Sequence, residues 1–284
     1  MKKFIQSLVA IFIMLLVIMA VKKPRVNKMT LNPIKLLFIS IIVLPSYPAL
    51  ASQNSDTLQD MSDPMAVFSQ FGAGYGDKGI NLMLGHAYDP GVKNRKAMHI
   101  FEIKGIAGDA VGWRGDNNNS VSEFRYRHFE ASMKTGTGTN IDLNYNLDSG
   151  LGTGTYGIIQ ALPKFGNFQA YPMLAVGATV IDLNKTNDRI ETENGSIGGH
   201  HLLGFYGLAG MYSRYNITDN LWLNYNPMSL IGATGELSGE TLFMHEGAIS
   251  YQLTSRSNIR YFANWSDNVN YRNGDHRIMY TYQI

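Results

Sequence analysis

The chain has 284 residues, including 29 Gly, 16 Tyr and 13 Phe, and it contains no Cys. The absence of cysteine excludes disulfides, thiolate metal ligands and a cysteine nucleophile, and a mean hydropathy of −0.11 excludes a protein built from many transmembrane helices. The abundance of Gly and Tyr at low overall charge favours β structure.

The charges are unevenly distributed along the chain. Seven of the 24 Lys and Arg residues, and none of the 22 Asp and Glu residues, lie within the first 51 positions. The formal net charge of +2 therefore comes from a basic N-terminal leader, and the remainder of the chain is mildly acidic. Because the leader produces the basic balance, we predict no nucleic-acid partner.

Residues 1–51 are predicted to form this leader, which contains two apolar segments. The first, residues 4–21, has the length of a membrane span but no good cleavage site of its own. It is either an inner-membrane anchor or upstream sequence that is not normally translated. We favour the second interpretation, because Met29 is a natural start that leaves a leader of ordinary length.

The second apolar segment, residues 36–44, is predicted to be the core of a signal peptide at about 29–51. It runs into PSYPALA, in which Ala49 and Ala51 form the A-x-A pattern of a cleavage site. Cleavage after Ala51 would export a protein that begins with a polar periplasmic segment, residues 52–65.

Beyond this segment, polar and apolar side chains alternate with a period of two. In NIDLNYNLD, residues 140–148, every second side chain is apolar and those between are Asp or Asn. This spacing puts the apolar residues on one face of a strand. Turns rich in Gly, Asn and Asp separate eleven such segments. The predicted strands lie near 79–88, 97–108, 121–133, 138–148, 152–162, 167–183, 200–216, 220–231, 241–253, 257–266 and 275–284.

Two architectures fit many antiparallel strands, a soluble β-sandwich and a closed membrane barrel. The secretory leader directs the chain across the inner membrane, and strands of about ten residues or more can cross a bilayer at a tilt. Aromatic residues near strand ends, namely Tyr88, Tyr145, Tyr225 and Tyr282, match the girdles of membrane barrels. We therefore predict an antiparallel transmembrane β-barrel in contact with outer-membrane lipid; a soluble periplasmic sandwich is the weaker alternative.

The last strand, RIMYTYQI, keeps the alternation to the end of the chain, with Ile278, Tyr280, Tyr282 and Ile284 on one face. In this feature residues 66–284 resemble the bacterial outer-membrane β-barrel proteins, without indicating a particular family among them. The resemblance implies that this strand is the signal for the barrel-assembly machinery and that it closes the barrel against the first strand. Ile284 stands where that class usually has a terminal aromatic residue.

Bacterial single-chain barrels have an even number of strands, whereas eleven are counted above. The segment AVFSQFGAGY, residues 66–75, can supply a first strand. We therefore predict twelve strands, with ten as the alternative if this segment lies elsewhere. A periplasmic C-terminus makes residues 184–199 the longest external loop, which could bind a partner, fold into the pore or shield the surface.

If the apolar face meets lipid, the other face lines the lumen and carries charges of both signs. Uncompensated charge in a narrow lumen is costly, so we expect these charges to pair. Two interpretations stay open: a narrow, passive, porin-like channel for small polar solutes, and a non-conducting structural or surface barrel acting through its external loops. The predicted lumen-lining residues are Glu102, Lys104, Glu123, Arg125, Arg127, Asp142, Asn144, Asn146, Glu246, Arg260 and Arg277.

A barrel hydrolase is the weakest interpretation. Outer-membrane hydrolases with a serine nucleophile resemble one another in carrying a His two residues before the Ser, and none of the seven His residues has this spacing. The adjacent His200 and His201 point to opposite faces of a strand, which disfavours a shared metal ion. The glycine clusters at 71–76 and 150–157 open no helix, so they lack the mechanism of a phosphate loop. We predict no enzymatic activity, no metal and no cofactor.

Overall fold

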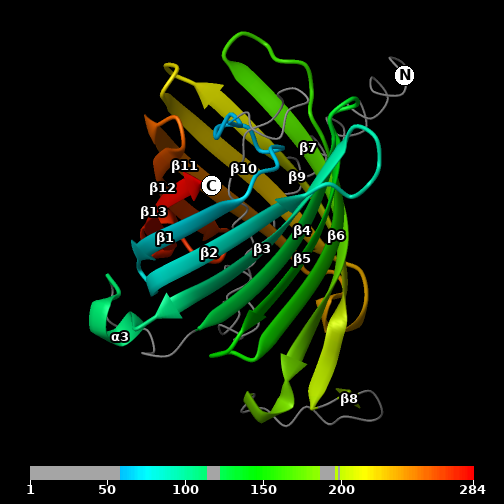
Figure 1. Cartoon of the computed structure of the whole chain (residues 1–284). Helices are drawn as coiled ribbons and strands as arrows, with labels where there is room; N and C mark the ends of the chain where they lie inside the picture. Colours follow the sequence, from blue (N-terminus) through cyan, green and yellow to red (C-terminus); the bar gives the residue numbers. More distant parts are fainter. Residues whose placement is uncertain (1–57, 114–121, 186–195, 198) are drawn as a thin grey trace. The chain divides into compact units, whose positions relative to one another are not determined.

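The computed structural model describes residues 58–113, 122–185, 196–197 and 199–284 (Figure 1). The predicted leader with its cleavage site at Ala49 and Ala51 lies outside the described residues, as does most of the loop 184–199. All described residues belong to one compact unit, Leu36–Ile284. Within this described part, no helix is long and apolar enough to cross a membrane.

The strands form a single antiparallel sheet, and twelve of them close into a barrel (Figure 1). Each of these twelve strands pairs with the next of the twelve along the chain, so that β7 pairs with β9, and β13 returns to β1. The two-residue strand β8, Ser196–Ile197, extends the end of β9. The barrel strands are β1 Gln70–Gly76, β2 Gly79–Tyr88, β3 Arg95–Ile106, β4 Glu123–Ser132, β5 Thr137–Asn146, β6 Leu151–Gln160, β7 Phe168–Asp182, β9 His200–Asn216, β10 Leu221–Gly232, β11 Thr241–Thr254, β12 Ser257–Ser266 and β13 Asp275–Gln283.

The predicted twelve strands and the closure of the last strand against the first are confirmed. β1 and β13 pair from Gln70 opposite Gln283 to Gly76 opposite Arg277. The amide of Ile284 donates a hydrogen bond of 2.9 Å to the carbonyl of Ser69, which extends the seam by one residue. The end of the chain is therefore held by strand pairing, as the resemblance implied.

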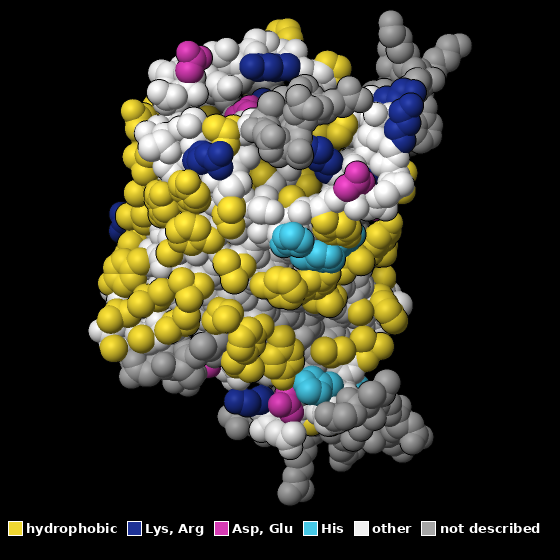
Figure 2. Space-filling model, viewed as in Figure 1, with side chains coloured by type: hydrophobic (Ala, Val, Ile, Leu, Met, Phe, Trp, Pro, Cys, Tyr) yellow, Lys and Arg dark blue, Asp and Glu magenta, His cyan; other side chains and the backbone are white. Residues whose placement is uncertain are grey.

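The exposed and buried faces have the polarity of a membrane barrel. Along β2, Leu82 and Leu84 are exposed, whereas Asn81 is buried. Figure 2 shows hydrophobic side chains in a broad band across the visible face, with most of the charged side chains above or below it. A soluble sandwich would bury these apolar side chains, so the exposed band excludes that alternative and places the apolar face against lipid.

Aromatic and His side chains lie outward near both edges of this band. Tyr88 stacks on His99 with ring centroids 4.9 Å apart, close to the ends of β2 and β3. Near the opposite edge, His245 stacks on Trp265 at 5.0 Å, and Tyr225 donates to or accepts from His245 at 2.7 Å. Rings of this kind suit the boundary between lipid and water, because one part of each ring is apolar and the other is polar.

The connections differ between the two ends of the barrel. At the end where the chain terminates, the strands are joined by turns such as 133–136 and 217–220, and we call this the periplasmic end. The other end carries most of the longer connections, which include one short α-helix and three short 3-10 helices. These elements are α3 Gly108–Val111, η2 Leu183–Lys185, η3 Gly235–Leu237 and η4 Tyr271–Asn273.

Candidate functional site in the barrel lumen

One layer of charged side chains points into the barrel from β3 and β4. Lys104 and Glu123 lie opposite each other in register and form an ion pair. Glu102 forms an ion pair with Arg127, one diagonal step away on the neighbouring strand, and its other oxygen lies 3.7 Å from the Lys104 ammonium. All four side chains are at most 6% exposed. The layer is therefore internally neutralised on these two strands.

The same layer continues onto β5 through Arg125 and Asp142. The Nε of Arg125 donates to Oδ1 of Asp142 at 2.8 Å, and its Nη2 bonds to Oδ2. This is a two-point guanidinium–carboxylate contact, which fixes both the distance and the orientation of the pair. The Arg125 side chain is fully buried and that of Asp142 is 12% exposed.

A second cluster of polar side chains comes from β10, β11 and β13. Nη1 of Arg277 donates to Oδ2 of Asp275 at 2.8 Å, and its Nη2 lies 3.9 Å from Oε2 of Glu246. The amide of Asn226 donates to Oε1 of Glu246 at 2.8 Å. The guanidinium of Arg277 also lies 4.6 Å from the centre of the Phe262 ring. These contacts compensate a cation and two carboxylates inside the barrel.

The eleven predicted lumen residues lie on β3, β4, β5, β11, β12 and β13. Ten of them are buried, the exception being Asn146. The side chain of Asn146 instead caps the turn after β5, since its Oδ1 accepts from the amides of Asp148 at 3.0 Å and Ser149 at 2.9 Å. Its role in the described structure is to shape this turn.

Residues 58–69, here called the plug, enter the lumen from the periplasmic end (Figure 1). Nη1 of Arg214 on β9 donates to Oδ2 of Asp60 at 2.9 Å and to Oγ of Ser62 at 2.7 Å. Three strands further round the barrel, Nη2 of Arg260 on β12 donates to the carbonyl of Met61 at 2.5 Å. Most of the plug is buried. Its buried residues are Gln59, Met61, Ser62, Asp63, Met65, Ala66, Val67 and Phe68.

Asp63 is the buried acidic residue of the plug. Its Oδ1 accepts a hydrogen bond of 2.8 Å from the amide of Met65, and the residue is 3% exposed. Burial raises the pKa of Asp63 to about 6, against the lowering effects of the Met65 amide, the nearby Arg214 and Tyr171. The sequence did not indicate this plug, because a short segment with Asp, Ser and Gln has the composition of an exposed linker.

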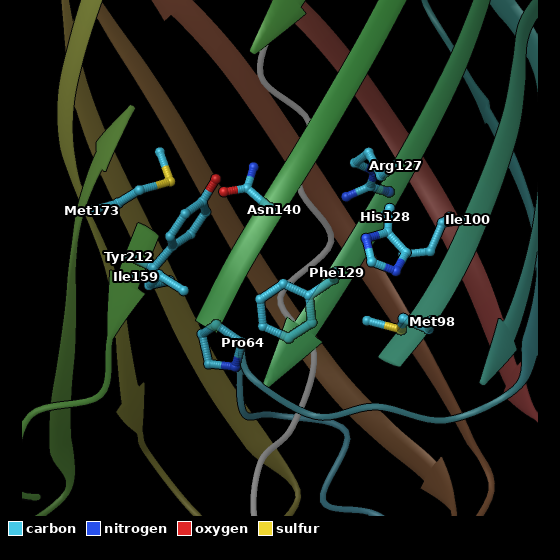
Figure 3. Close-up of a pocket in the computed structure, with 10 residues that line it drawn as sticks. All are labelled: Pro64, Met98, Ile100, Arg127, His128, Phe129, Asn140, Ile159, Met173 and Tyr212. Carbon is cyan, nitrogen blue, oxygen red and sulfur yellow. The ribbon is translucent and has the colours of Figure 1, made fainter. Parts of the chain in front are cut away.

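A small cavity of about 40 Å³ lies between the plug and the wall (Figure 3). We call it the chamber. Its walls are mostly apolar and come from β3, β4, β5, β6, β7 and β9, with Pro64 of the plug below. The lining residues are Pro64, Met98, Ile100, Arg127, His128, Phe129, Asn140, Ile159, Met173 and Tyr212.

Three buried polar atoms of the chamber have no hydrogen-bond partner within the described structure. They are Nε of Arg127, Oδ1 of Asn140 and the hydroxyl of Tyr212. Sequence reasoning identified Arg127 alone among these three. A signal for the chamber was present where an inward and an outward apolar residue are neighbours, as in Ile158–Ile159 and Met173–Leu174, because such pairs interrupt the polar alternation.

The adjacent histidines have different partners. Nε2 of His200 lies 3.0 Å from the hydroxyl of Tyr145, and Nε2 of His201 lies 2.9 Å from Oε1 of Glu236. Among the residues that the structure describes, no three His, Asp or Glu side chains are grouped so that they could hold a metal ion.

No protein-family model and no curated protein sequence matches the chain. Among solved structures, an outer membrane channel from Pseudomonas putida F1 is similar, with a TM-score of 0.50, 8% identity, and coverage of 82% of this chain and 100% of the other. A KdgM porin in complex with disordered oligogalacturonate and a NanC porin each have a TM-score of 0.45, with 8% and 6% identity, and cover 77% of this chain and 99% of their own. At these identities the likeness concerns the fold.

The fold is that of the bacterial outer-membrane β-barrels. Its features are a closed ring of twelve antiparallel strands, an apolar outer band and the similarity to the Pseudomonas putida channel. These features place the protein in the outer membrane, in contact with lipid.

Proposed function

We propose that this porin-like barrel is a narrow passive channel for small polar solutes and that the plug is its gate. The supporting observation is the way in which the plug is held. Side chains of Arg214 and Arg260 bind it from the wall. Apart from the Ser69 carbonyl, which accepts from Ile284 where the plug joins β1, the backbone–backbone hydrogen bonds described for the plug are local, such as that from the amide of Ala66 to the carbonyl of Asp63 at 3.4 Å. A segment held in this way can leave the lumen while the strand ladder of the barrel stays intact.

The charge layer gives the proposed channel a polar wall. Once the plug leaves, water can reach the ion pairs on β3, β4 and β5, which contain three cations and three anions. These are Lys104, Arg125 and Arg127, and Glu102, Glu123 and Asp142. Because the charges balance, we expect weak ion selectivity in the open barrel. Neutral Gln at Arg125 and Arg127 should shift the selectivity toward cations.

A non-conducting structural or surface barrel is the second candidate. It is favoured by the burial and pairing of the inward charges, such as Arg125 with Asp142, which would stabilise a filled interior equally well. In that case the function would reside in the external loops. We propose no enzymatic activity for either barrel, and we further propose that β13 is recognised by the barrel-assembly machinery after a signal peptide at about 29–51 is removed.

Planar-bilayer recordings would distinguish the two candidates. The full chain is expressed in a bacterial host, and the protein extracted from outer membranes is compared with Arg214→Met and with a deletion of residues 59–67. Arg256→Met is the matched control, since Arg256 lies at the same end and contacts the carbonyl of Gln283. We expect rare openings for the wild type and the control, frequent openings for Arg214→Met, and a steadily open channel for the deletion.

The deletion variant also provides the result that would contradict the proposal. A deletion variant that is folded, as judged by heat-modifiable migration on a gel, but inserts into bilayers without conducting would refute the channel. The non-conducting barrel would then be the correct description.

A further inference from the structure

Arg214 is a buried cation whose negative partners come from the plug. Its side chain is 6% exposed, and among the residues that the structure describes its ion pair is with Asp60, at 2.9 Å. Asp63, the second acidic residue of the plug, also attracts it electrostatically. From the wall, the neutral Oε1 of Gln169 accepts a hydrogen bond of 3.0 Å from its Nη2. When the plug leaves, Arg214 therefore stays in the barrel without either of the two carboxylates.

A second arginine approaches the same turn of the plug. Nη2 of Arg260 donates to the carbonyl of Met61, which lies between the two residues that bind Arg214, namely Asp60 and Ser62. The two guanidinium groups thus converge on three consecutive plug residues, which present a carboxylate, a carbonyl oxygen and a hydroxyl. A small organic anion with one carboxylate and further oxygen acceptors offers the same groups, and arginine binds them well because its planar fork donates several hydrogen bonds.

The contact between Arg214 and Asp60 is open to solvent on the side of the plug. The Asp60 side chain is 52% exposed. An ion pair with a solvated partner is weak, so a dissolved carboxylate can take the place of Asp60. The buried guanidinium needs a negative partner whether or not the plug is present. Because the plug is tethered to β1, its effective concentration is on the order of millimolar, and a dissolved anion must reach a similar concentration to compete.

We propose that Arg214 and Arg260 form a binding site for a small organic anion with a carboxylate and a second oxygen acceptor, and that residues 60–62 occupy this site while the plug lies in the lumen. Binding of the anion displaces the turn and releases the plug. The inference rests on the proposed function, in which the plug is the gate, and adds the chemical class of the ligand that opens it. The site lies on β9 and β12, apart from the balanced charge layer on β3, β4 and β5.

Cysteine labelling of the plug would test this proposal. The chain has no cysteine, so Met65→Cys places a single thiol at a plug residue that is 3% exposed. The full chain is expressed in a bacterial host, and the protein extracted from outer membranes is modified with maleimide-linked polyethylene glycol and followed by gel shift. We expect millimolar succinate to accelerate labelling severalfold and saturably, because the thiol is reached when the plug is out. Sodium chloride at the same ionic strength, and neutral succinamide, should have little effect.

Three variants in the Met65→Cys background make the result specific to the arginine site. Asp60→Asn removes the competing carboxylate and keeps both arginines, so the half-maximal succinate concentration should fall about fivefold. Arg214→Met should label rapidly without succinate and respond to it no further. Arg256→Met is the matched control and should keep the full response, because Arg256 lies at the same end and contacts the carbonyl of Gln283.

Two results would overturn the proposal. Equal acceleration by succinate and by sodium chloride at matched ionic strength would mean that salt only screens the ion pair. An unchanged half-maximal succinate concentration for Asp60→Asn would mean that the anion does not compete with Asp60.

Labelling reports the position of the plug and not conductance, so this proposal and the proposed function can fail separately. Succinate-driven labelling of a barrel that does not conduct would support the anion site and refute the channel. A conducting deletion of residues 59–67, combined with labelling of the full chain that does not respond to succinate, would support the channel and refute the anion site.

Discussion

The pair formed by Arg125 and Asp142 gives a direct measure of how dry the lumen is. Two hydrogen bonds join the side chains, one of them 2.8 Å long, and their exposed fractions are 0% and 12%. Removing one partner leaves the other charge buried without compensation, which costs about 3–5 kcal/mol in protein interiors. Arg125→Met and Asp142→Leu should each lower the free energy of unfolding by that amount.

The double variant should be much less destabilised than the sum of the single variants. Replacing both members of a buried pair by apolar side chains of similar size is often close to neutral. We therefore expect the double variant to lose at most about 2 kcal/mol, which gives a coupling energy of several kcal/mol. Arg95→Met is the control, because the Arg95–Glu130 pair is 47% and 21% exposed and should contribute less than about 1 kcal/mol.

Urea unfolding of the four variants in lipid vesicles, followed by tryptophan fluorescence, measures these free energies. Single losses below about 1 kcal/mol that simply add in the double variant would refute the reasoning. Such a result is expected of charges already surrounded by water. It would mean that the resting lumen is hydrated rather than filled.

Two other predictions follow from close contacts and from the plug. A Cβ at Gly76 would lie 2.2 Å from the carbonyl oxygen of His276 across the β1–β13 seam. Gly76→Val should therefore lower the free energy of unfolding by about 1–3 kcal/mol in the same urea assay. Gly207→Val is the control and should be nearly neutral, because a Cβ at Gly207 meets no atom within 4 Å. The pKa of Asp63 rises from 3.8 to about 6 when the plug lies in the lumen, so protonation of Asp63 favours the bound plug. Binding of the plug in the lumen is therefore strongest below about pH 4. It weakens by up to about 3 kcal/mol as the pH rises through 6. Hydrogen exchange of the plug amides, corrected for intrinsic rates, should show this loss, and an Asp63→Asn protein that keeps the full pH dependence would contradict it.

The sequence by itself determined the class of the fold and the two faces of its strands. The period-two alternation and the Gly- and Asn-rich turns fixed the strand segments, because successive side chains of a strand necessarily point to opposite faces. The even strand number required a first strand within 66–75, and the structure has it at Gln70–Gly76. The alternation of successive side chains along each strand also placed residues such as Glu102 and Arg127 on the inward face.

Only the tertiary structure decided which inward residues meet. Glu102 lies opposite Arg125 in the strand register, yet its ion pair is with Arg127, one diagonal step away. Parity gives the face of a side chain, but the partner depends on register and on how the side chains pack inside the closed ring.

The plug and the chamber were also decided at this level. Ser62 is buried because Arg214 binds it from 152 positions further along the chain. The chamber lies between Pro64 of the plug and the side chains of the barrel wall. Strand alternation is a local property of the backbone, and a sequence displays it directly. Occupancy of a lumen depends on contacts between residues that are distant in the chain, which become defined only when the barrel closes.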